Sequence, residues 1–220
     1  MKIIDVTGTI ENGMWEYGPP YPKVAIEQVC SVDDEPTIAN YKVNAFRIAL
    51  STSSGTYIHA PAELIKGAPP IDQIPVDRFV REAAVLRFPR KKQPAEPITL
   101  QELRASKVEV KPGDAVIVQT GWEKMWNQPN FVTDSPYFSE EALDWILAKD
   151  ISLLAGDLTV YDNFKQPTGR VTRIFQQGVL VLAPLVNLFR ISRDRVKLIA
   201  LPLKVKGASG CSCRAIVIEE

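Results

Sequence analysis

The segment from Ser51 to Glu63 reads STSSGTYIHAPAE and contains His59, the one histidine of this 220-residue chain. It follows the run from Phe46 to Leu50, whose alternating apolar side chains predict a half-exposed strand. A Gly-Thr pair after a strand lets the backbone turn sharply, and Pro61 restricts the backbone beyond the turn. The side chains in between can therefore converge on a cleft.

Two side chains of this segment could carry acid–base chemistry. His59 lies four residues before Glu63, and a carboxylate can orient an imidazole and raise its basicity. The same residues are also compatible with a structural histidine that hydrogen-bonds locally, because no third partner is visible in the sequence. Both interpretations stay open on these residues alone.

Short apolar runs separated by turn residues predict a fold rich in strands. Several runs are continuously apolar, which is typical of strands covered on both faces. The predicted strands span residues 83–88, 115–119, 151–155, 179–182, 196–201 and 213–218.

Helices are predicted at three places between these strands. Thr99 and Glu102 have the spacing of a capping box, and Ser139 can cap a second helix. A third, short helix is predicted over residues 172–177, ended by Gly178. Strands interleaved with few helices predict one mixed α/β domain over residues 1–220.

The charge balance argues against a nucleic-acid partner. Lys plus Arg and Asp plus Glu number 26 each, so there is no global field to attract phosphate. A basic cluster is predicted to be a solvated loop after a strand. It consists of Arg87, Arg90, Lys91 and Lys92.

Other features exclude further classes of protein. No apolar stretch approaches the roughly 18 residues that cross a bilayer, and no secretion leader is recognisable, so we expect a cytoplasmic protein without a membrane partner. Three cysteines without CxxC spacing argue against a disulfide framework and a zinc site. Cys211 and Cys213 are expected to be small buried side chains on one face of a strand.

The segment from Ser53 to Glu63 resembles the cyclase family of metal-dependent hydrolases, which includes bacterial kynurenine formamidases and isatin hydrolases. The family carries HxGTHxDxPxH after a strand, and this chain reads SSGTYIHAPAE in the same frame, with Gly55, Thr56 and Pro61 matching. Further similarities follow in the family's order at residues 4–7, 120–122, 156–162 and 199–204. The resemblance implies a swivelling β/β/α fold with a mixed, partly barrel-like central sheet flanked by helices.

The residues that carry the family's chemistry are replaced. Its three metal ligands fall on Ser53, Tyr57 and His59, and its last histidine falls on Glu63. A serine hydroxyl and an un-ionised tyrosine are poor ligands for zinc or manganese. We therefore expect no tightly bound metal, although weak zinc or manganese binding through His59 stays compatible with the residues. The family's later glutamate falls on Ala183.

The resemblance implies two alternative functions. The first is a hydrolase or cyclase that acts on a C–N or C–O bond of a small amide or lactone-like substrate. His59 would be its general base, Glu63 its orienting group or acid, and Tyr57 a hydrogen-bond donor to the oxyanion. The second is a catalytically inactive relative that binds a small aromatic ligand.

The resemblance also implies a ligand pocket and an oligomer. Trp15, Tyr17, Ser53 and Trp122 are expected to bind the substrate, although Trp122 is equally compatible with a core position. Family members are usually homodimers or homotetramers, so the loop with Trp15 and Tyr17 would complete a neighbour's site.

Overall fold

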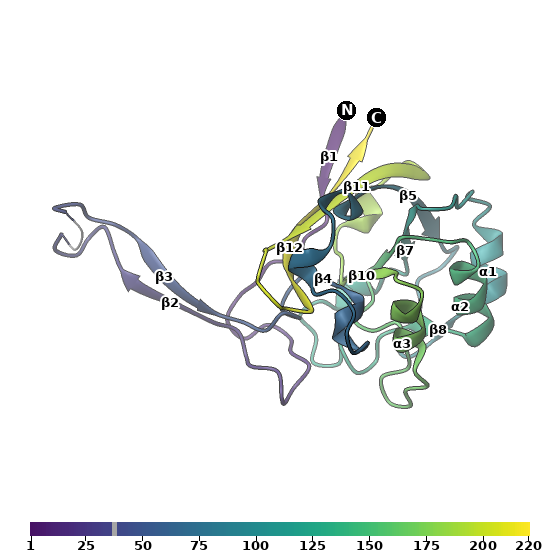
Figure 1. Cartoon of the computed structure of the whole chain (residues 1–220), viewed down its shortest axis with the longest axis horizontal. Coiled ribbons are helices and arrows are strands. Elements are labelled where there is room, and N and C mark those ends of the chain that lie inside the picture. Colours follow the sequence, from purple (N-terminus) through teal and green to yellow (C-terminus); the bar gives the residue numbers. More distant parts are fainter. Residues whose placement is uncertain (37–38) are drawn as a thin grey trace.

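Continuously apolar strands form the wall of a barrel. The computed structural model describes residues 1–36 and 39–220. Their sheet has the order β1–β12–β11–β5–β7–β9–β10–β4, and β4 also pairs with β12, which closes the barrel (Figure 1). The strands are β1 (Lys2–Asp5), β4 (Tyr57–His59), β5 (Val80–Arg87), β7 (Ala115–Gln119), β9 (Leu153–Gly156), β10 (Leu180–Ala183), β11 (Arg195–Pro202) and β12 (Gly210–Glu219). The six strands predicted from apolar runs are therefore confirmed, as is the predicted mixed sheet.

The barrel separates two hydrophobic clusters because successive strand side chains point to opposite faces. Ile117 and Leu153 belong to the cluster inside the barrel, whereas Val118 and Leu154 pack outward against the helices. Strands β5, β7, β9 and β10 run parallel, and β4, β11 and β12 are antiparallel to their neighbours. On β4, Ile58 joins the inner cluster, so Tyr57 and His59 face outward.

Three helices cover one outer side of the barrel, namely α1 (Leu100–Ala105), α2 (Glu140–Leu147) and α3 (Arg170–Gln176) (Figure 1). The predicted caps are confirmed, since Thr99 and Glu102 form a capping box and the Ser139 side chain accepts from the Ala142 N–H. Helix α3 begins two residues earlier than predicted. The Asp162 carboxylate accepts from the backbone N–H groups of Thr168 and Gly169, just before the helix, and of Arg170, its first residue.

Short strands and 3₁₀ turns connect the barrel strands and the helices. Strands β6 (Pro97–Ile98) and β8 (Tyr137–Phe138) form a small parallel pair. Single 3₁₀ turns are η1 (Pro61–Glu63), η2 (Ile71–Gln73), η3 (Val76–Phe79), η4 (Trp122–Met125) and η5 (Leu188–Arg190). None of the helices in the described part of the chain has the length and apolar character to span a membrane. Cys211 and Cys213 are buried on β12, as predicted.

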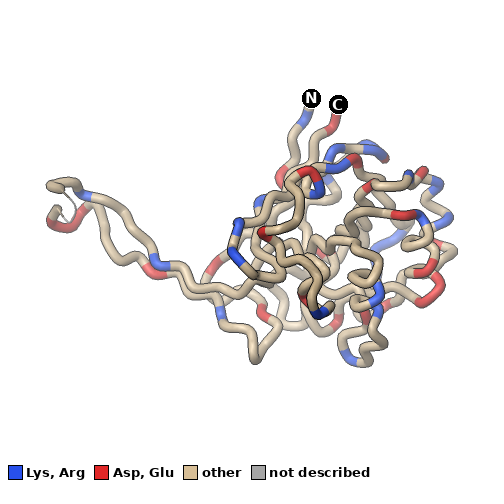
Figure 2. The backbone as a smooth tube through the Cα atoms, viewed as in Figure 1, with Lys and Arg blue, Asp and Glu red and all other residues tan. Residues whose placement is uncertain are grey.

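Strands β2 (Ala25–Cys30) and β3 (Ala45–Ala49) form a two-stranded arm that projects away from the barrel (Figure 1). The strand predicted at residues 46–50 is present, but its expected burial is wrong. Phe46 and Ile48 are 55% and 58% exposed, because the arm does not lie against the barrel. Figure 2 shows acidic and basic residues interspersed along the whole backbone.

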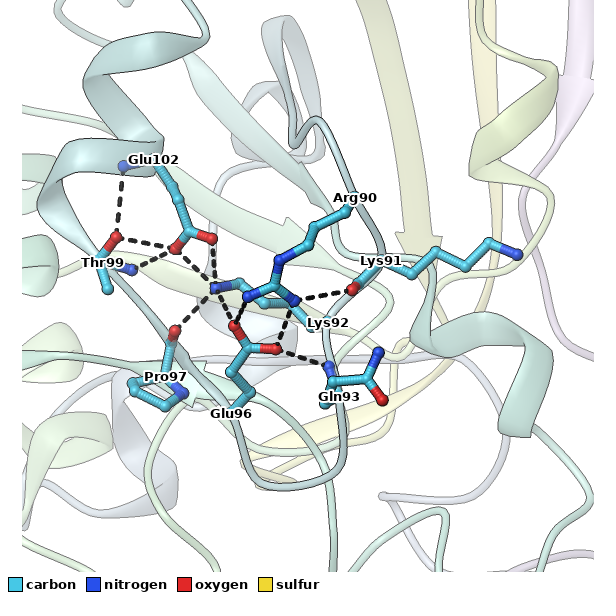
Figure 3. Close-up of polar contacts among 8 residues, drawn as sticks. All are labelled: Arg90, Lys91, Lys92, Gln93, Glu96, Pro97, Thr99 and Glu102. Atoms are coloured by element: carbon cyan, nitrogen blue, oxygen red, sulfur yellow. Dashed lines mark hydrogen bonds and ion pairs between the residues drawn. The ribbon is translucent and has the colours of Figure 1, made fainter.

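The basic loop after β5 is only partly solvated, which corrects the prediction for Lys92. Its side chain is 1% exposed, and its Nζ donates to both carboxylate oxygens of Glu102 at 2.6 Å and to Pro97 O at 2.8 Å (Figure 3). The hydrogen bond from Arg90, together with that from Lys92, lowers the pKa of Glu96 to about 2. These ion pairs hold the loop against the start of α1.

We expect Lys92→Met to lower the free energy of unfolding by about 2 kcal/mol, because it leaves partly buried carboxylates without their cation. Urea unfolding measures this change. Lys91→Met on the exposed neighbouring side chain is the control and should change stability by less than about 0.5 kcal/mol. Equal effects of the two substitutions would contradict the role of the buried ammonium.

Candidate active site

Strand β4 places the candidate site on the outer face of the barrel. His59 is paired with Val181 of β10 on one side and Gly210 of β12 on the other. A Cβ atom at Gly210 would lie 2.0 Å from His59 Cδ2, so a side chain there would collide with the imidazole. Gly55 has a φ of +68°, the left-handed conformation that the predicted sharp turn before β4 requires.

The imidazole of His59 lies between a hydroxyl and a carboxylate. Its Nε2 is 3.2 Å from Ser53 Oγ, and its Nδ1 is 3.9 Å from Glu63 Oε2. Turn η1 brings Glu63 back toward β4, and the Ser209 hydroxyl donates to the same Glu63 oxygen. Thus Ser53, His59 and Glu63 form one contiguous polar group.

Burial controls the protonation of this group. His59 and Ser53 are both buried, and burial lowers the pKa of His59, with the negative charge of Glu63 opposing that shift. A neutral imidazole is therefore favoured near pH 7, and its lone pair can accept a proton. This is the state that a general base requires.

Two tyrosines form a second polar group beside the histidine. The hydroxyls of Tyr17 and Tyr57 are 2.6 Å apart, and Tyr17 OH also donates to Thr159 O at 2.6 Å. The ring centroids of Tyr57 and His59 are 4.6 Å apart. Burial raises the pKa of both tyrosines well above the ordinary value, so both are un-ionised. Because Tyr17 OH donates to Thr159 O, Tyr57 OH donates its own proton to the Tyr17 oxygen. Tyr57 can donate to an oxyanion only after this hydrogen bond to Tyr17 breaks.

These polar groups open onto a cleft of about 330 Å³. Ser53, His59 and Glu63 form a polar part of its lining, and the remainder is mostly apolar and aromatic. The remaining lining residues are Tyr17, Tyr21, Tyr57, Leu64, Thr159, Val160, Tyr161, Phe164, Val171, Phe175 and Val181. The cleft can thus enclose a flat apolar ligand with its polar group directed at the histidine.

Two of the residues expected to bind substrate lie elsewhere. Trp122 is 3% exposed, and its Nε1 donates to Phe131 O at 2.9 Å, so it is a core residue and its predicted place in the pocket is wrong. Trp15 packs against Tyr17 and Trp126 and lines a separate hollow of about 400 Å³. By contrast, the structure brings the other five predicted site residues together in the cleft.

Sequence reasoning missed the groups that support the site from distant segments. Ser209 lies 146 residues from Glu63, and Tyr17 OH bonds to Thr159 O 142 residues away. No periodicity or local motif links such positions. Gly210 also carries no signal in the sequence, because its role depends on the register between β12 and β4.

Comparison with known proteins gives a consistent result. The Cyclase family model, "Putative cyclase", matches residues 4–163. An isatin hydrolase of Roseibium aggregatum is 24% identical over 248 residues, which cover 99% of this chain and 92% of that protein. Isatin hydrolase A from Ralstonia solanacearum has a TM-score of 0.84 at 19% identity, over 100% of this chain and 92% of its own. A structure described as a potential metal-dependent hydrolase with cyclase activity has a TM-score of 0.77 at 21% identity, over 100% and 99%. These likenesses confirm the predicted fold.

The residues of this cleft do not fit a zinc or manganese ion. His59 Nε2 faces the Ser53 hydroxyl, and the un-ionised Tyr57 hydroxyl is bonded to Tyr17. Within residues 1–36 and 39–220, no three His, Cys, Asp or Glu side chains are grouped so that they could share a metal ion. Such ions are normally held by several imidazole, thiolate or carboxylate ligands.

The single histidine permits a direct test of the site's electrostatics. We expect its ring protons, followed by NMR on a tag-free chain, to titrate with a midpoint below 6.5, because burial disfavours the imidazolium. Glu63→Gln should lower the midpoint further, since it removes the charge that favours the protonated form. The urea-unfolded chain is the control. Because the native state binds this proton less readily than the unfolded state, the free energy of unfolding should fall as the pH drops below 6.5. A titration midpoint of the native His59 above that of the unfolded chain would contradict this account.

Proposed function

Because the chain belongs to the Cyclase family, we propose that it is a hydrolase that opens a small aromatic amide or lactone-like ring in the cleft beside His59. The observation that carries the proposal is the buried imidazole of His59, which lies between Ser53 and Glu63 in the lining of an aromatic cleft. This arrangement supplies a base among the residues that line the cleft.

The shape of the cleft supports an aromatic substrate. Tyr21, Phe164 and Phe175 line its apolar part, and a volume of about 330 Å³ suits a ligand of one or two fused rings. One similar structure is an isatin hydrolase with the product analogue thioisatinate bound. A cyclic amide of the isatin class is therefore the first substrate to test.

The proposed chemistry needs no bound metal. His59 accepts a proton from the attacking oxygen, and Glu63 orients the ring and stabilises the imidazolium that forms. Acid–base catalysis of this kind contributes about 10² to 10⁴-fold to the rate. Tyr57 can stabilise the oxyanion once its hydrogen bond to Tyr17 breaks, because its ring lies 4.6 Å from that of His59.

A catalytically inactive binding protein is the alternative. It is favoured by the 3.9 Å separation of His59 Nδ1 and Glu63 Oε2, which is longer than a hydrogen bond, and by the prior engagement of the Tyr57 hydroxyl. Ala183, at the family's glutamate position, is also unable to transfer a proton. In this alternative the cleft binds an aromatic ligand without turnover.

Activity assays separate the two functions. We expect slow opening of isatin-class amides, formanilides or aryl lactones that is unchanged by a chelator or by added zinc or manganese. His59→Asn should reduce kcat/KM by at least about 100-fold, and Glu63→Gln by about 10-fold. The variant Trp15→Phe, outside the cleft, should stay close to wild type. Substrate binding measured by calorimetry, without any turnover, would support the alternative of an inactive binding protein. Activity that depends on a stoichiometric metal would contradict the metal-free chemistry.

We also propose that the protein forms a homodimer or homotetramer through the arm of β2 and β3. Phe46, Ile48 and Tyr41 on this arm are largely exposed, and an isolated two-stranded hairpin is marginally stable in water. The even charge balance of the chain favours a second copy over a strongly charged partner.

The double substitution Phe46→Glu and Ile48→Glu should therefore convert the oligomer to a monomer, because it places charges on the apolar face of the arm. Sedimentation velocity measures the mass. Lys42→Glu, an exposed polar position of the same arm, is the control and should leave the oligomer intact. A monomeric wild-type chain at micromolar concentration would contradict the proposal.

A further inference from the structure

We propose that Ser53 is the nucleophile of the hydrolase, so that the reaction passes through an ester between Ser53 Oγ and the acyl part of the substrate. The inference rests on the proposed function, because it requires that the protein turns over a substrate. It assigns to Ser53 a covalent role, whereas the sequence predicted only substrate binding.

The geometry of the three side chains supports this role. A serine nucleophile needs a base within hydrogen-bond reach, and Ser53 Oγ lies 3.2 Å from His59 Nε2. The base needs an orienting group on its other nitrogen, and Glu63 Oε2 lies 3.9 Å from Nδ1. Hydrogen bonds of this kind are often long before substrate binds. The Ser209 hydroxyl donates to the same Glu63 oxygen and so restrains the carboxylate.

The position of the carboxylate also selects the useful form of the imidazole. A negative charge on the Nδ1 side favours the tautomer with its proton on Nδ1. The lone pair is then on Nε2, which faces the Ser53 hydroxyl. A neutral His59 can therefore take the serine proton without any rearrangement of the ring.

Neighbouring hydroxyls are less suited to attack. Thr56 Oγ1 donates to Pro184 O at 2.6 Å, and Ser54 Oγ is bonded to Ser51. The Tyr17 hydroxyl donates to Thr159 O, and the Tyr57 hydroxyl then donates to Tyr17. Ser53 lines the cleft and is itself positioned by the bond from its own N–H to Ser51 Oγ at 3.1 Å.

The steps balance with water as the only co-reactant. Ser53 Oγ bonds to the substrate's carbonyl carbon as its proton passes to His59 Nε2. The C–N or C–O bond of the ring then breaks, and the leaving atom takes that proton. Next, a water molecule gives a proton to Nε2 while its oxygen attacks the acyl carbon. The bond to Oγ breaks, and Ser53 regains the proton from His59.

A fluorophosphonate probe tests the nucleophile on the full chain. It reacts with activated serines by displacement of fluoride and leaves a stable phosphonate ester, so rapid hydrolysis cannot conceal the adduct. We expect one adduct per chain, located on Ser53 by peptide mass spectrometry. Ser53→Ala should abolish labelling and lower kcat by at least about 100-fold. Thr52→Ala, one residue away in the same turn, should retain both.

The histidine NMR signal verifies that Ser53→Ala and Thr52→Ala keep their folded site. His59→Asn, which lacks this signal, should lose labelling together with turnover while urea unfolding shows that it is folded. Turnover without labelling of Ser53, with Ser53→Ala within about threefold of wild type, would overturn this inference but leave the proposed function standing. Absence of both labelling and turnover would overturn the inference together with the proposed function.

Discussion

The pairing of β4 with β10 on one side and β12 on the other is the constraint on which the rest of the structure depends. Three residues close the barrel, so their alternation determines what each side chain can do. Ile58 enters the inner cluster, whereas Tyr57 and His59 face the cleft. Gly210 completes the arrangement, because only the absence of a side chain lets the imidazole lie across β12.

The chemistry of the cleft follows from what surrounds one imidazole. Burial lowers the pKa of His59 and so favours the neutral imidazole. The Ser53 hydroxyl lies near one of its nitrogens, and Glu63 lies near the other. Where the family places metal ligands, this chain has a hydroxyl and a phenol that bond to neighbouring side chains. The metal-free proton transfer that we propose rests on this difference in side chains.

Local patterns predicted the framework well, and long-range contacts limited the prediction of the site. The Thr99 and Glu102 cap and the apolar strands depend on neighbours in the sequence, so they were predicted correctly. The burial of Trp122 and Lys92 depends on what packs over them, which no local pattern contains. Tyr17 was placed in the cleft by family resemblance, whereas its partner, Thr159 O, became visible only in the fold.

The length of β12 has a consequence for the order in which the molecule folds. This strand, Gly210–Glu219, pairs with β11 along one edge and with both β4 and β1 along the other, so it joins the two ends of the chain. Such pairings are distant in sequence and slow to form. During synthesis on the ribosome, the edge of β4 that pairs with β12 therefore stays open until β12 has been made, and His59 lacks its neighbour Gly210 until then.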